Sequence, residues 1–375
     1  MKISSNFDSG NIEAVSCESH SNIRLNIRKD TNSDTFQWFY FRLHGAEGFP
    51  CVIHIENAGK ASYPEAWDDY NAYASYNRVT WFCVPTSYKN GVLTIEHTLE
   101  QNSVFYAFST PYTYNQHLDM VSAAQRSPLC ILEFLGETVE GKDIDLLIVG
   151  EPDEKKKKIW IIGRQHPGEP QAEWFIQGFI ERILDAIDPV SKTLLSKAIF
   201  YIVPNMNIDG SIAGNLRVNA AGKNLNREWA KPDRETCPEV FFTLKRMEET
   251  GVDLFLDIHA DETLPYCFTS GIEGIPSYDD RLKWLQENFT AKWAEFNPEF
   301  QTEHGYPKNE PGKANLSIAS KSVGEQFKCL SMTVEMPFKD NKNFPDKQFG
   351  WSSLRSLKLG GSILNPILFV IDRLR

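Results

Sequence analysis

Residues 159–187 read IWIIGRQHPGEPQAEWFIQGFIERILDAI, and this stretch decides the fold of the larger part of the chain. Its first four residues are all apolar, a run typical of a fully buried strand. Apolar side chains then recur with helical spacing at positions 172, 175, 176, 179, 180, 183, 184 and 187. A buried strand followed by an amphipathic helix is the repeating unit of an α/β layered fold.

Further apolar runs extend this pattern on both sides. They are Ile199–Val203, Val252–Ile258 and Leu330–Phe338, and Ile131–Val149 adds a hairpin upstream. Because strands alternate with helices, we expect residues 119–375 to form an α/β domain with a mixed, mainly parallel sheet flanked by helices. Open sheets of this kind place their ligand sites at the carboxyl ends of the strands.

The first third of the chain has a different pattern. Short runs rich in aromatic and β-branched residues are separated by Gly, Pro, Asn and Ser, which is typical of strands joined by turns. The runs are Phe36–Leu43, Cys51–Ile55, Arg78–Val84 and Ser103–Ser109. Asn90–Gly91 suits a tight hairpin turn, because both residues adopt positive φ readily. We therefore predict an all-β antiparallel sandwich over residues 1–118.

Composition excludes several classes of protein. The 375 residues include 39 basic and 50 acidic side chains, and the net charge of −11 argues against a nucleic-acid partner. Met1–Gly10 has no apolar signal segment, and we expect no later stretch to reach the length of a membrane span, so we predict a cytoplasmic protein without a membrane partner. The seven cysteines are scattered without a CxxC pair, which indicates buried thiols rather than disulfides or a cysteine zinc site.

Three candidate metal ligands follow two of the buried strands. His166 and Glu169 form a His-x-x-Glu pair after the strand at 159–162, and His259 ends the strand at 252–258. Two histidines and one glutamate leave a fourth position open, as in catalytic zinc sites. A lone His-x-x-Glu pair is common at the start of helices, and it is the third ligand that favours a metal site.

Other polar residues suggest chemistry around this metal. Arg217, Asn226 and Arg227 lie in a loop-like region rich in Gly and Asn, where guanidinium groups could bind a carboxylate; the alternative is surface salt bridging. Glu335 is the one ionisable residue in the apolar run LSMTVEMPF. It could take a proton from a zinc-activated water and return it to a leaving amine, or it could belong to a structural ion pair.

These motifs together resemble the M14 zinc metallocarboxypeptidases, and in particular the bacterial form of the cytosolic carboxypeptidases. The matching motifs are HPGE at 166–169, NIDG at 207–210, G-N-x-R and L-N-R-x-W within 214–229, DIH at 257–259 and TVEMPF at 333–338. The PYTY junction at 111–114 and the preceding β domain resemble the cytosolic subfamily. The resemblance thus covers nearly the whole chain and implies a zinc carboxypeptidase-like fold.

The resemblance implies a role for each candidate residue. One zinc ion per chain would be held by His166, Glu169 and His259, and Glu335 would be the general base and acid. Asn226 and Arg227 would bind the terminal carboxylate of a peptide, while Arg217 would stabilise the oxyanion. Tyr306 is the candidate for the tyrosine that closes over the substrate, with an ordinary loop aromatic as the alternative.

One position departs from the family pattern. Family members commonly have Asp two residues before the Asn-Arg pair, where it orients a zinc-bound histidine, and here that residue is Asn224. An amide oxygen can still accept the imidazole N–H, but it brings no negative charge to raise the basicity of the ligand. We expect this change to tune the metal site rather than to inactivate it.

The expected function is hydrolysis of C-terminal residues from peptides or protein tails. Resemblance to the cytosolic subfamily implies a preference for acidic residues such as glutamate, which needs a basic group in the pocket. Candidates for that group are Lys313, Lys321, Lys339 and Arg355. The alternatives are an aspartoacylase-like zinc amidase or deacylase of N-acyl amino acids, and a protein that binds through its sandwich domain and carries a vestigial zinc domain.

Overall fold

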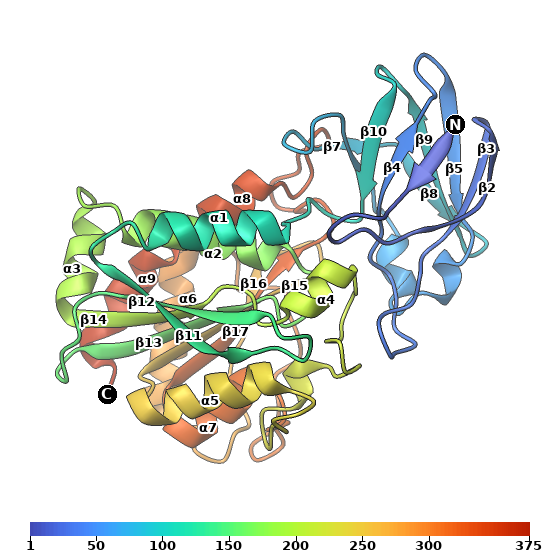
Figure 1. Cartoon of the computed structure of the whole chain (residues 1–375). Coiled ribbons are helices and arrows are strands. Elements are labelled where there is room, and N and C mark those ends of the chain that lie inside the picture. Colours follow the sequence, from blue (N-terminus) through green and yellow to red (C-terminus); the bar gives the residue numbers. More distant parts are fainter.

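The computed structural model describes residues 1–375 and shows two parts joined along one side (Figure 1). The N-terminal part contains two five-stranded sheets whose buried side chains share one hydrophobic core. The first sheet has the order β1 (Lys2–Ser4), β4 (Tyr40–His44), β10 (Ser103–Ala107), β6 (Ala72–Ser75) and β7 (Phe82–Val84). The second has the order β2 (Glu13–Ser19), β3 (Asn22–Asn26), β5 (Pro50–Ile55), β9 (Val92–Thr98) and β8 (Thr86–Lys89).

Strand pairing in the N-terminal part is antiparallel, as predicted, except between β3 and β5, which run parallel. Asn90 and Gly91 have φ angles of 52° and 81° and connect β8 to β9 in the tight turn expected of this dipeptide. Two short 3-10 helices, η1 (Ala58–Lys60) and η2 (Pro64–Trp67), lie between β5 and β6.

The larger part is built on one seven-stranded sheet. Its order is β11 (Cys130–Glu137), β12 (Asp143–Val149), β14 (Ala198–Val203), β13 (Lys157–Gly163), β15 (Leu254–Asp261), β17 (Leu330–Pro337) and β16 (Phe268–Ser270). The four central strands β14, β13, β15 and β17 are parallel to one another. The outer strands β11, β12 and β16 pair antiparallel with their neighbours. This confirms the predicted mixed, mainly parallel sheet.

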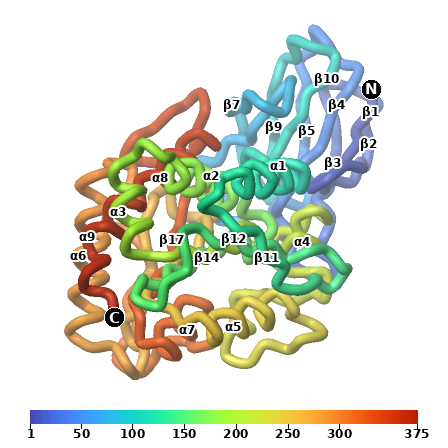
Figure 2. Tube along the Cα trace, turned by 60° about the vertical axis from the view of Figure 1, so that its left-hand side comes forward, coloured from blue at the N-terminus to red at the C-terminus, as the bar shows by residue number.

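Helices cover both faces of this sheet, as Figures 1 and 2 show. Alternate residues of β13 serve the two faces: Ile159 and Ile161 belong to the core on one side, and Trp160 and Ile162 to the core on the other. The first face carries α1 (Tyr114–Ala124), α2 (Gln171–Ile183), α3 (Pro189–Lys197), α6 (Asp280–Phe296), α8 (Ser353–Ser362) and α9 (Leu364–Val370). The second carries α5 (Pro238–Thr250) and α7 (Ala319–Phe327). The remaining helices are short: α4 (Ile208–Ala213), η3 (Leu225–Arg227) and η4 (Ile371–Arg373).

One finding differs from the sequence-based expectation about membrane spans. Ser353–Arg373 is long and apolar enough to cross a membrane by length and composition alone, with a mean hydropathy of 1.3. In the structure this stretch is divided into α8, α9 and η4, and 56% of its apolar window is buried in the protein. Packing in the protein core therefore accounts for the apolar side chains of this stretch.

A close contact between α8 and α2 explains two glycines of that core. A Cβ atom at Gly178 of α2 would clash with the backbone carbonyl of Leu357, and one at Gly360 of α8 would clash with that of Phe175. Only glycine lets the two helix backbones approach so closely. This contact fixes α2, the helix that begins two residues after Glu169.

All seven cysteines are free and five of them are buried, as the sequence indicated. The predicted division into residues 1–118 and 119–375 falls within α1, Tyr114–Ala124. The division stays a prediction.

Candidate active site

The parallel register of the central strands brings the candidate residues to one edge of the sheet. Gly163 at the end of β13 pairs with Ile258 of β15, and His259 pairs with Glu335 of β17. The turn that follows β13 carries His166 and Glu169 to the same edge. Side chains separated by as many as 169 residues therefore meet because three strands end side by side.

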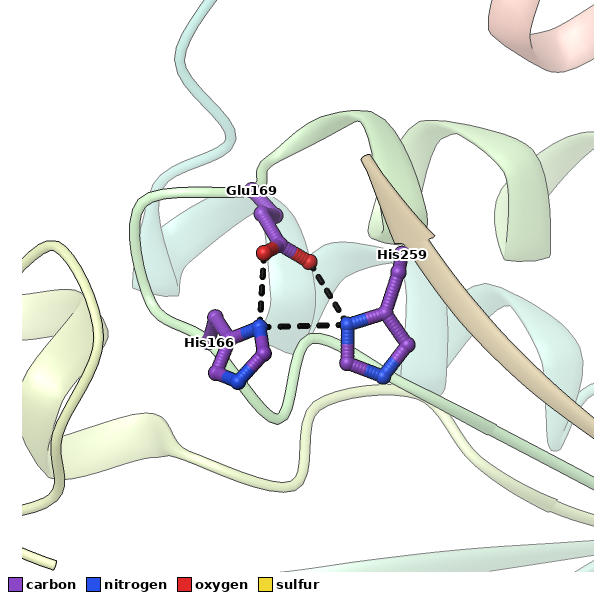
Figure 3. A group of neighbouring side chains, drawn as sticks. All are labelled: His166, Glu169 and His259. Carbon is purple, nitrogen blue, oxygen red and sulfur yellow. Dashed lines mark hydrogen bonds and ion pairs between the residues drawn. The ribbon is translucent and has the colours of Figure 1, made fainter. Parts of the chain in front are cut away.

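His166, Glu169 and His259 converge on one point, as Figure 3 shows. Nδ1 of His166 lies 2.6 Å from Glu169 Oε1, Nδ1 of His259 lies 2.8 Å from Oε2, and the two Nδ1 atoms are 3.2 Å apart. All three side chains are buried. The predicted ligand atoms are thus within reach of a single ion.

The outer nitrogen of each imidazole is bound elsewhere. Nε2 of His166 lies 3.1 Å from Oδ1 of Asn224, and Nε2 of His259 lies 2.9 Å from Oδ1 of Asp257. The Asn224 oxygen accepts a hydrogen bond from Nε2 of His166, and the negative charge of Asp257 favours a proton on Nε2 of His259, so the lone pairs on Nδ1 point inward toward the carboxylate. Lone pairs and carboxylate oxygens this close repel one another unless a cation or a proton lies between them.

The pKa values of the two histidines agree with this donor set. Burial lowers the pKa of His166 to about 4, so its ring is neutral and ready to donate a lone pair. Burial also lowers the pKa of His259, but the carboxylates of Asp257 and Glu169 outweigh it and raise that pKa well above its usual value. A positive charge is therefore favoured between His259 and Glu169.

The donor set fits zinc. Zinc binds imidazole nitrogen and carboxylate oxygen at about 2.0–2.2 Å with tetrahedral angles, which places two bound nitrogens roughly 3.3 Å apart. The 3.2 Å between the Nδ1 atoms agrees with that value. Three protein ligands leave the fourth position for catalysis.

Asn224 accepts the Nε2–H of His166 in the place expected for the family aspartate. We expect Asn224→Asp to keep zinc bound and to tighten it, because a carboxylate makes the histidine a stronger donor. Asn224→Ala should weaken zinc binding by about 10–100-fold, since the ring loses its orienting partner. Competition with a chelator of known affinity measures both effects, and loss of metal from Asn224→Asp would contradict this assignment.

Glu335 has the properties of a proton carrier. It is 6% exposed, and its Oε2 atom makes no hydrogen bond in the protein. Burial raises its pKa well above the usual range; His259 opposes this shift, and the neighbouring acids Glu169, Asp261 and Glu262 reinforce it. A buried carboxyl group with a raised pKa and a free oxygen is suited to accept a proton and release it again.

One cavity of about 510 Å³ contains the whole predicted set. Only 4 of its 19 lining residues are hydrophobic, which suits a charged ligand. All the candidate residues line it: His166, Glu169, Arg217, Asn226, Arg227, His259, Tyr306 and Glu335. The structure thus brings together every residue that the sequence singled out for the site.

The residues around the metal set are held in different ways. Asn226 accepts the backbone N–H of Ala319 through Oδ1, and Arg227 donates to the backbone carbonyl of Asn226 at 2.6 Å. The hydroxyl of Tyr306 donates to Asp261 Oδ2 at 2.5 Å. Burial and nearby acids raise the pKa of Tyr306, so its phenol stays protonated and can donate to an acceptor.

Sequence reasoning missed several residues of this cavity. Asp261 and Glu262 follow the DIH motif after Ala260, and their position two and three residues after His259 could have indicated them. Tyr63 and Glu65 come from the N-terminal part, and no local signal connects them to a site built about 100 residues later. Lys321, one of four basic residues considered, also lines the cavity.

Comparison with known proteins finds matches to both parts of the chain. The profile of the cytosolic carboxypeptidase N-terminal domain matches residues 3–109, and that of zinc carboxypeptidase matches residues 114–349. A Shewanella denitrificans protein assigned as a carboxypeptidase A is 51% identical, with a TM-score of 0.99 over 100% of both chains. A Pseudomonas aeruginosa metallo-carboxypeptidase, solved with (2-guanidinoethylmercapto)succinic acid, is 42% identical, with a TM-score of 0.97 over 100% of both chains.

A more distant relative is mouse cytosolic carboxypeptidase 3, which is 27% identical over 318 residues. The match covers 75% of the chain but only 31% of the mouse protein, so the mouse enzyme is much longer. The two profiles together account for most of the present chain, in the order in which its two parts occur. The chain belongs to the M14 family of zinc carboxypeptidases and is a metallocarboxypeptidase that carries the N-terminal domain of the cytosolic carboxypeptidases.

Proposed function

We propose that this enzyme is a zinc exopeptidase that removes C-terminal residues from peptides or protein tails. The observation that carries the proposal is the meeting of three elements in one cavity. These are the buried His166–Glu169–His259 donor set, the unpaired carboxyl oxygen of Glu335 and the arginines at 217 and 227. Together they combine a metal ligand set, a proton carrier and cationic groups for a carboxylate.

Glu335 is proposed to carry the proton through the reaction. Zinc, when bound by His166, Glu169 and His259, supplies Lewis acidity that polarises the scissile carbonyl and acidifies water. Glu335 takes a proton from the attacking water through its free Oε2 atom. It then gives that proton to the amide nitrogen as the C–N bond breaks, so the amine leaves neutral and the carboxylate is regenerated.

The cationic groups are proposed to bind the substrate on either side of the scissile bond. Asn226 and Arg227 take the terminal carboxylate, since a guanidinium fork pairs with both of its oxygens. Arg217 stabilises the negative charge that develops on the carbonyl oxygen. Tyr306 covers the bound chain end. The compound bound by the P. aeruginosa relative contains a succinic acid, with two carboxyl groups, which supports a site for carboxylates.

A substrate panel tests this function. We expect hydrolysis of peptides with a free C-terminus and none of the same peptides with an amidated C-terminus, because the amide cannot pair with Arg227. Short N-acyl amino acids should be poor substrates. Faster turnover of N-acyl amino acids than of tripeptides would instead support the amidase alternative. Tail binding by residues 1–118 without turnover by the full chain would support the binding alternative.

A preference for acidic residues is supported by Lys321. Its side chain lines the cavity and is 4% exposed, yet it makes no ion pair, and its only polar contact is Ser270 Oγ at 3.5 Å. Burial lowers its pKa to about 8, with Glu273 as the opposing influence. A buried lysine without a carboxylate partner is costly, so an acidic side chain of the substrate is a favourable ligand for it.

The other basic candidates do not occupy the cavity. Lys313 is exposed, and Arg355 is paired with Glu299 and Asp340. Lys339 is half-buried near acidic residues of the N-terminal part. Lys321 is therefore the residue that we propose selects glutamate at the chain end.

Lys321→Met should abolish the preference for C-terminal glutamate. We expect the ratio of kcat/KM for Glu over Ala peptides to fall by about 30-fold, because a buried charge pair contributes about 2 kcal/mol or more. In the unmodified enzyme this ratio should also fall as pH rises through about 8, since the free lysine then loses its charge. In Lys321→Met the ratio should not change with pH.

Lys308→Met provides the matched control. Lys308 lies on the neighbouring loop, its side chain is 75% exposed, and its nearest carboxylate is that of Glu273 at 3.4 Å. This variant removes the same charge near the same acid and should retain both the preference and its pH dependence. Equal loss in the two variants would show that the preference comes from the overall charge of the region and not from Lys321.

Three further points stay predictions of the proposed function. One zinc ion per chain is expected, because the structure offers one group of three metal-ligating side chains. A cytoplasmic location is expected from the relatives that share the N-terminal domain, which are named cytosolic. We expect neither a nucleic acid nor a membrane as partner.

A further inference from the structure

The loop that carries Arg217 is fastened to the N-terminal part through one buried carboxylate. Asp30 accepts the backbone N–H of Leu216 at 2.7 Å, of Arg217 at 2.8 Å and of Val218 at 3.3 Å. A fourth bond, from Thr35 Oγ1 at 2.9 Å, holds the carboxylate itself. Three successive N–H groups around Arg217 therefore converge on a residue that lies 187 positions earlier in the chain.

Neighbouring contacts hold the residues just before Leu216. Thr31 donates to Asn215 Oδ1 through its backbone N–H at 3.0 Å and its hydroxyl at 3.1 Å, and Asn11 donates to the carbonyl of Gly214 at 2.8 Å. Gly214 has a φ of 75°, and a side chain there would clash with the N-terminal part. In Figure 1 this loop, which follows α4, lies beside the N-terminal part. The loop therefore packs closely against the surface of the N-terminal part.

The side chain of Arg217 is also held by the N-terminal part. Its guanidinium carbon lies 5.6 Å from the ring centre of Tyr63, within the range of a cation–π interaction. Tyr63 in turn is fixed by the buried side chain of Gln37. Gln37 accepts its backbone N–H at 2.8 Å and donates to its carbonyl at 3.0 Å.

The nature of this contact matters for catalysis. The Arg217 guanidinium makes no hydrogen bond and no ion pair in the protein, so the cation–π contact with Tyr63 is the polar interaction that holds it. An ion pair would compete with the substrate for the N–H groups of the guanidinium. A cation–π contact takes up none of those N–H groups in a hydrogen bond, so they stay free for an oxyanion.

We propose that the N-terminal part completes the active site by positioning Arg217, with Asp30 acting on its backbone and Tyr63 on its guanidinium. Both are positioning residues, and the inference rests on the proposed role of Arg217 at the oxyanion. A preorganised donor contributes most when the protein does not have to reorder it during the reaction. The N-terminal part would thus raise kcat from outside the domain that binds zinc.

A double-mutant cycle tests the inference. Tyr63→Ala should lower kcat about 10-fold with little change in KM, and Tyr63→Phe should retain most activity, because the ring is kept. Arg217→Ala should lower kcat more. Adding Tyr63→Ala to Arg217→Ala should cause no further loss, since Tyr63 acts through Arg217.

Asp30 is tested in the same way. Asp30→Asn should lower kcat in the presence of Arg217 and have little effect in Arg217→Ala. Thermal unfolding and zinc content verify that each variant is folded. If Asp30→Asn is not folded, the inference is tested by Tyr63→Ala. Thr31→Val is the control: it removes a bond of the same interface without touching Arg217, so kcat should stay within twofold.

The outcomes separate the inference from the function. The positioning role would be overturned if the losses of kcat multiply in the double variants, or if Tyr63→Phe and Tyr63→Ala lose the same amount of kcat. Neither result would contradict the proposed exopeptidase function. Wild-type kcat in Arg217→Ala would overturn the oxyanion role itself. Loss of kcat in Tyr63→Ala that disappears in the Arg217→Ala background is the result that supports the inference.

Discussion

Glu335→Gln should lower kcat for peptide hydrolysis by about 10²–10⁴-fold, the range for loss of a general acid–base. Glutamine keeps the shape of the side chain but cannot accept a proton from water or return it to the amine. Zinc content and KM should stay close to those of the unmodified enzyme, because Glu335 is not among the three metal-ligating residues. Single-turnover rates on a tripeptide, with metal analysis of the same sample, measure these effects.

Glu262→Gln is the control for this prediction. Glu262 is a buried acid of the same cavity, and burial raises its pKa to about 8. Its replacement makes the same carboxyl-to-amide change in the same cavity without removing the proposed proton carrier, so we expect less than a 10-fold loss. Wild-type turnover by Glu335→Gln, or an equally large loss in Glu262→Gln, would assign the proton transfer to another group.

Removal of a metal ligand should have the second large effect. His166→Gln is expected to lose zinc and, with it, all but a trace of activity, since the remaining donors are Glu169 and His259 alone. A chelator should inactivate the unmodified enzyme in the same way, and added zinc should restore that enzyme but not the variant. Zinc at 1,000 times its Kd should stabilise the folded enzyme by about 4 kcal/mol, because the unfolded chain lacks the site.

His304→Gln is the matched control for the metal site. His304 is exposed and stacks on Tyr266, away from the three ligands. Its replacement should leave zinc content, activity and the zinc-dependent rise in unfolding temperature unchanged. Retention of one zinc ion by His166→Gln would show that the metal binds elsewhere.

The grouping of the candidate site residues could be predicted because the ends of buried strands can be recognised in the sequence. A buried strand such as Ile159–Ile162 is a continuous apolar run, and the first polar residues after it must lie at the edge of the sheet. His259 and Glu335 lie on neighbouring strands in direct register, which no single run reveals. The presence of both residues within family motifs of the same chain indicated that they lie close together.

Other parts of the fold left weaker signals. The strand β2, with the sequence EAVSCES, is an edge strand with mostly exposed side chains, so it lacks the apolar alternation that marks a strand. Phe36–Leu43 was predicted as one strand, but the observed strand begins at Tyr40. Phe36 and Trp38 are buried without sheet pairing, because apolar residues record burial and not backbone conformation.

Contacts between the two parts were beyond sequence reasoning. In the sequence, Asp30 and Tyr63 are ordinary polar and aromatic residues of a β domain. Only the folded structure shows that they contact Arg217. Such long-range pairs depend on the final packing and leave no local period or motif. The choice of Lys321 among four basic residues depended on packing in the same way.

The glycine contact between α2 and α8 links the C-terminal helices to the position of one proposed metal ligand, Glu169. Glu169 is joined to α2 by Pro170 alone, so the ligand follows any movement of the helix. Gly178 and Gly360 set how far α2 can move toward α8, and a methyl group at either would push the two helices apart. The position of the Glu169 carboxylate relative to its two histidines therefore depends on α2, and the position of α2 is set in part by a helix that comes after the last metal ligand in the chain.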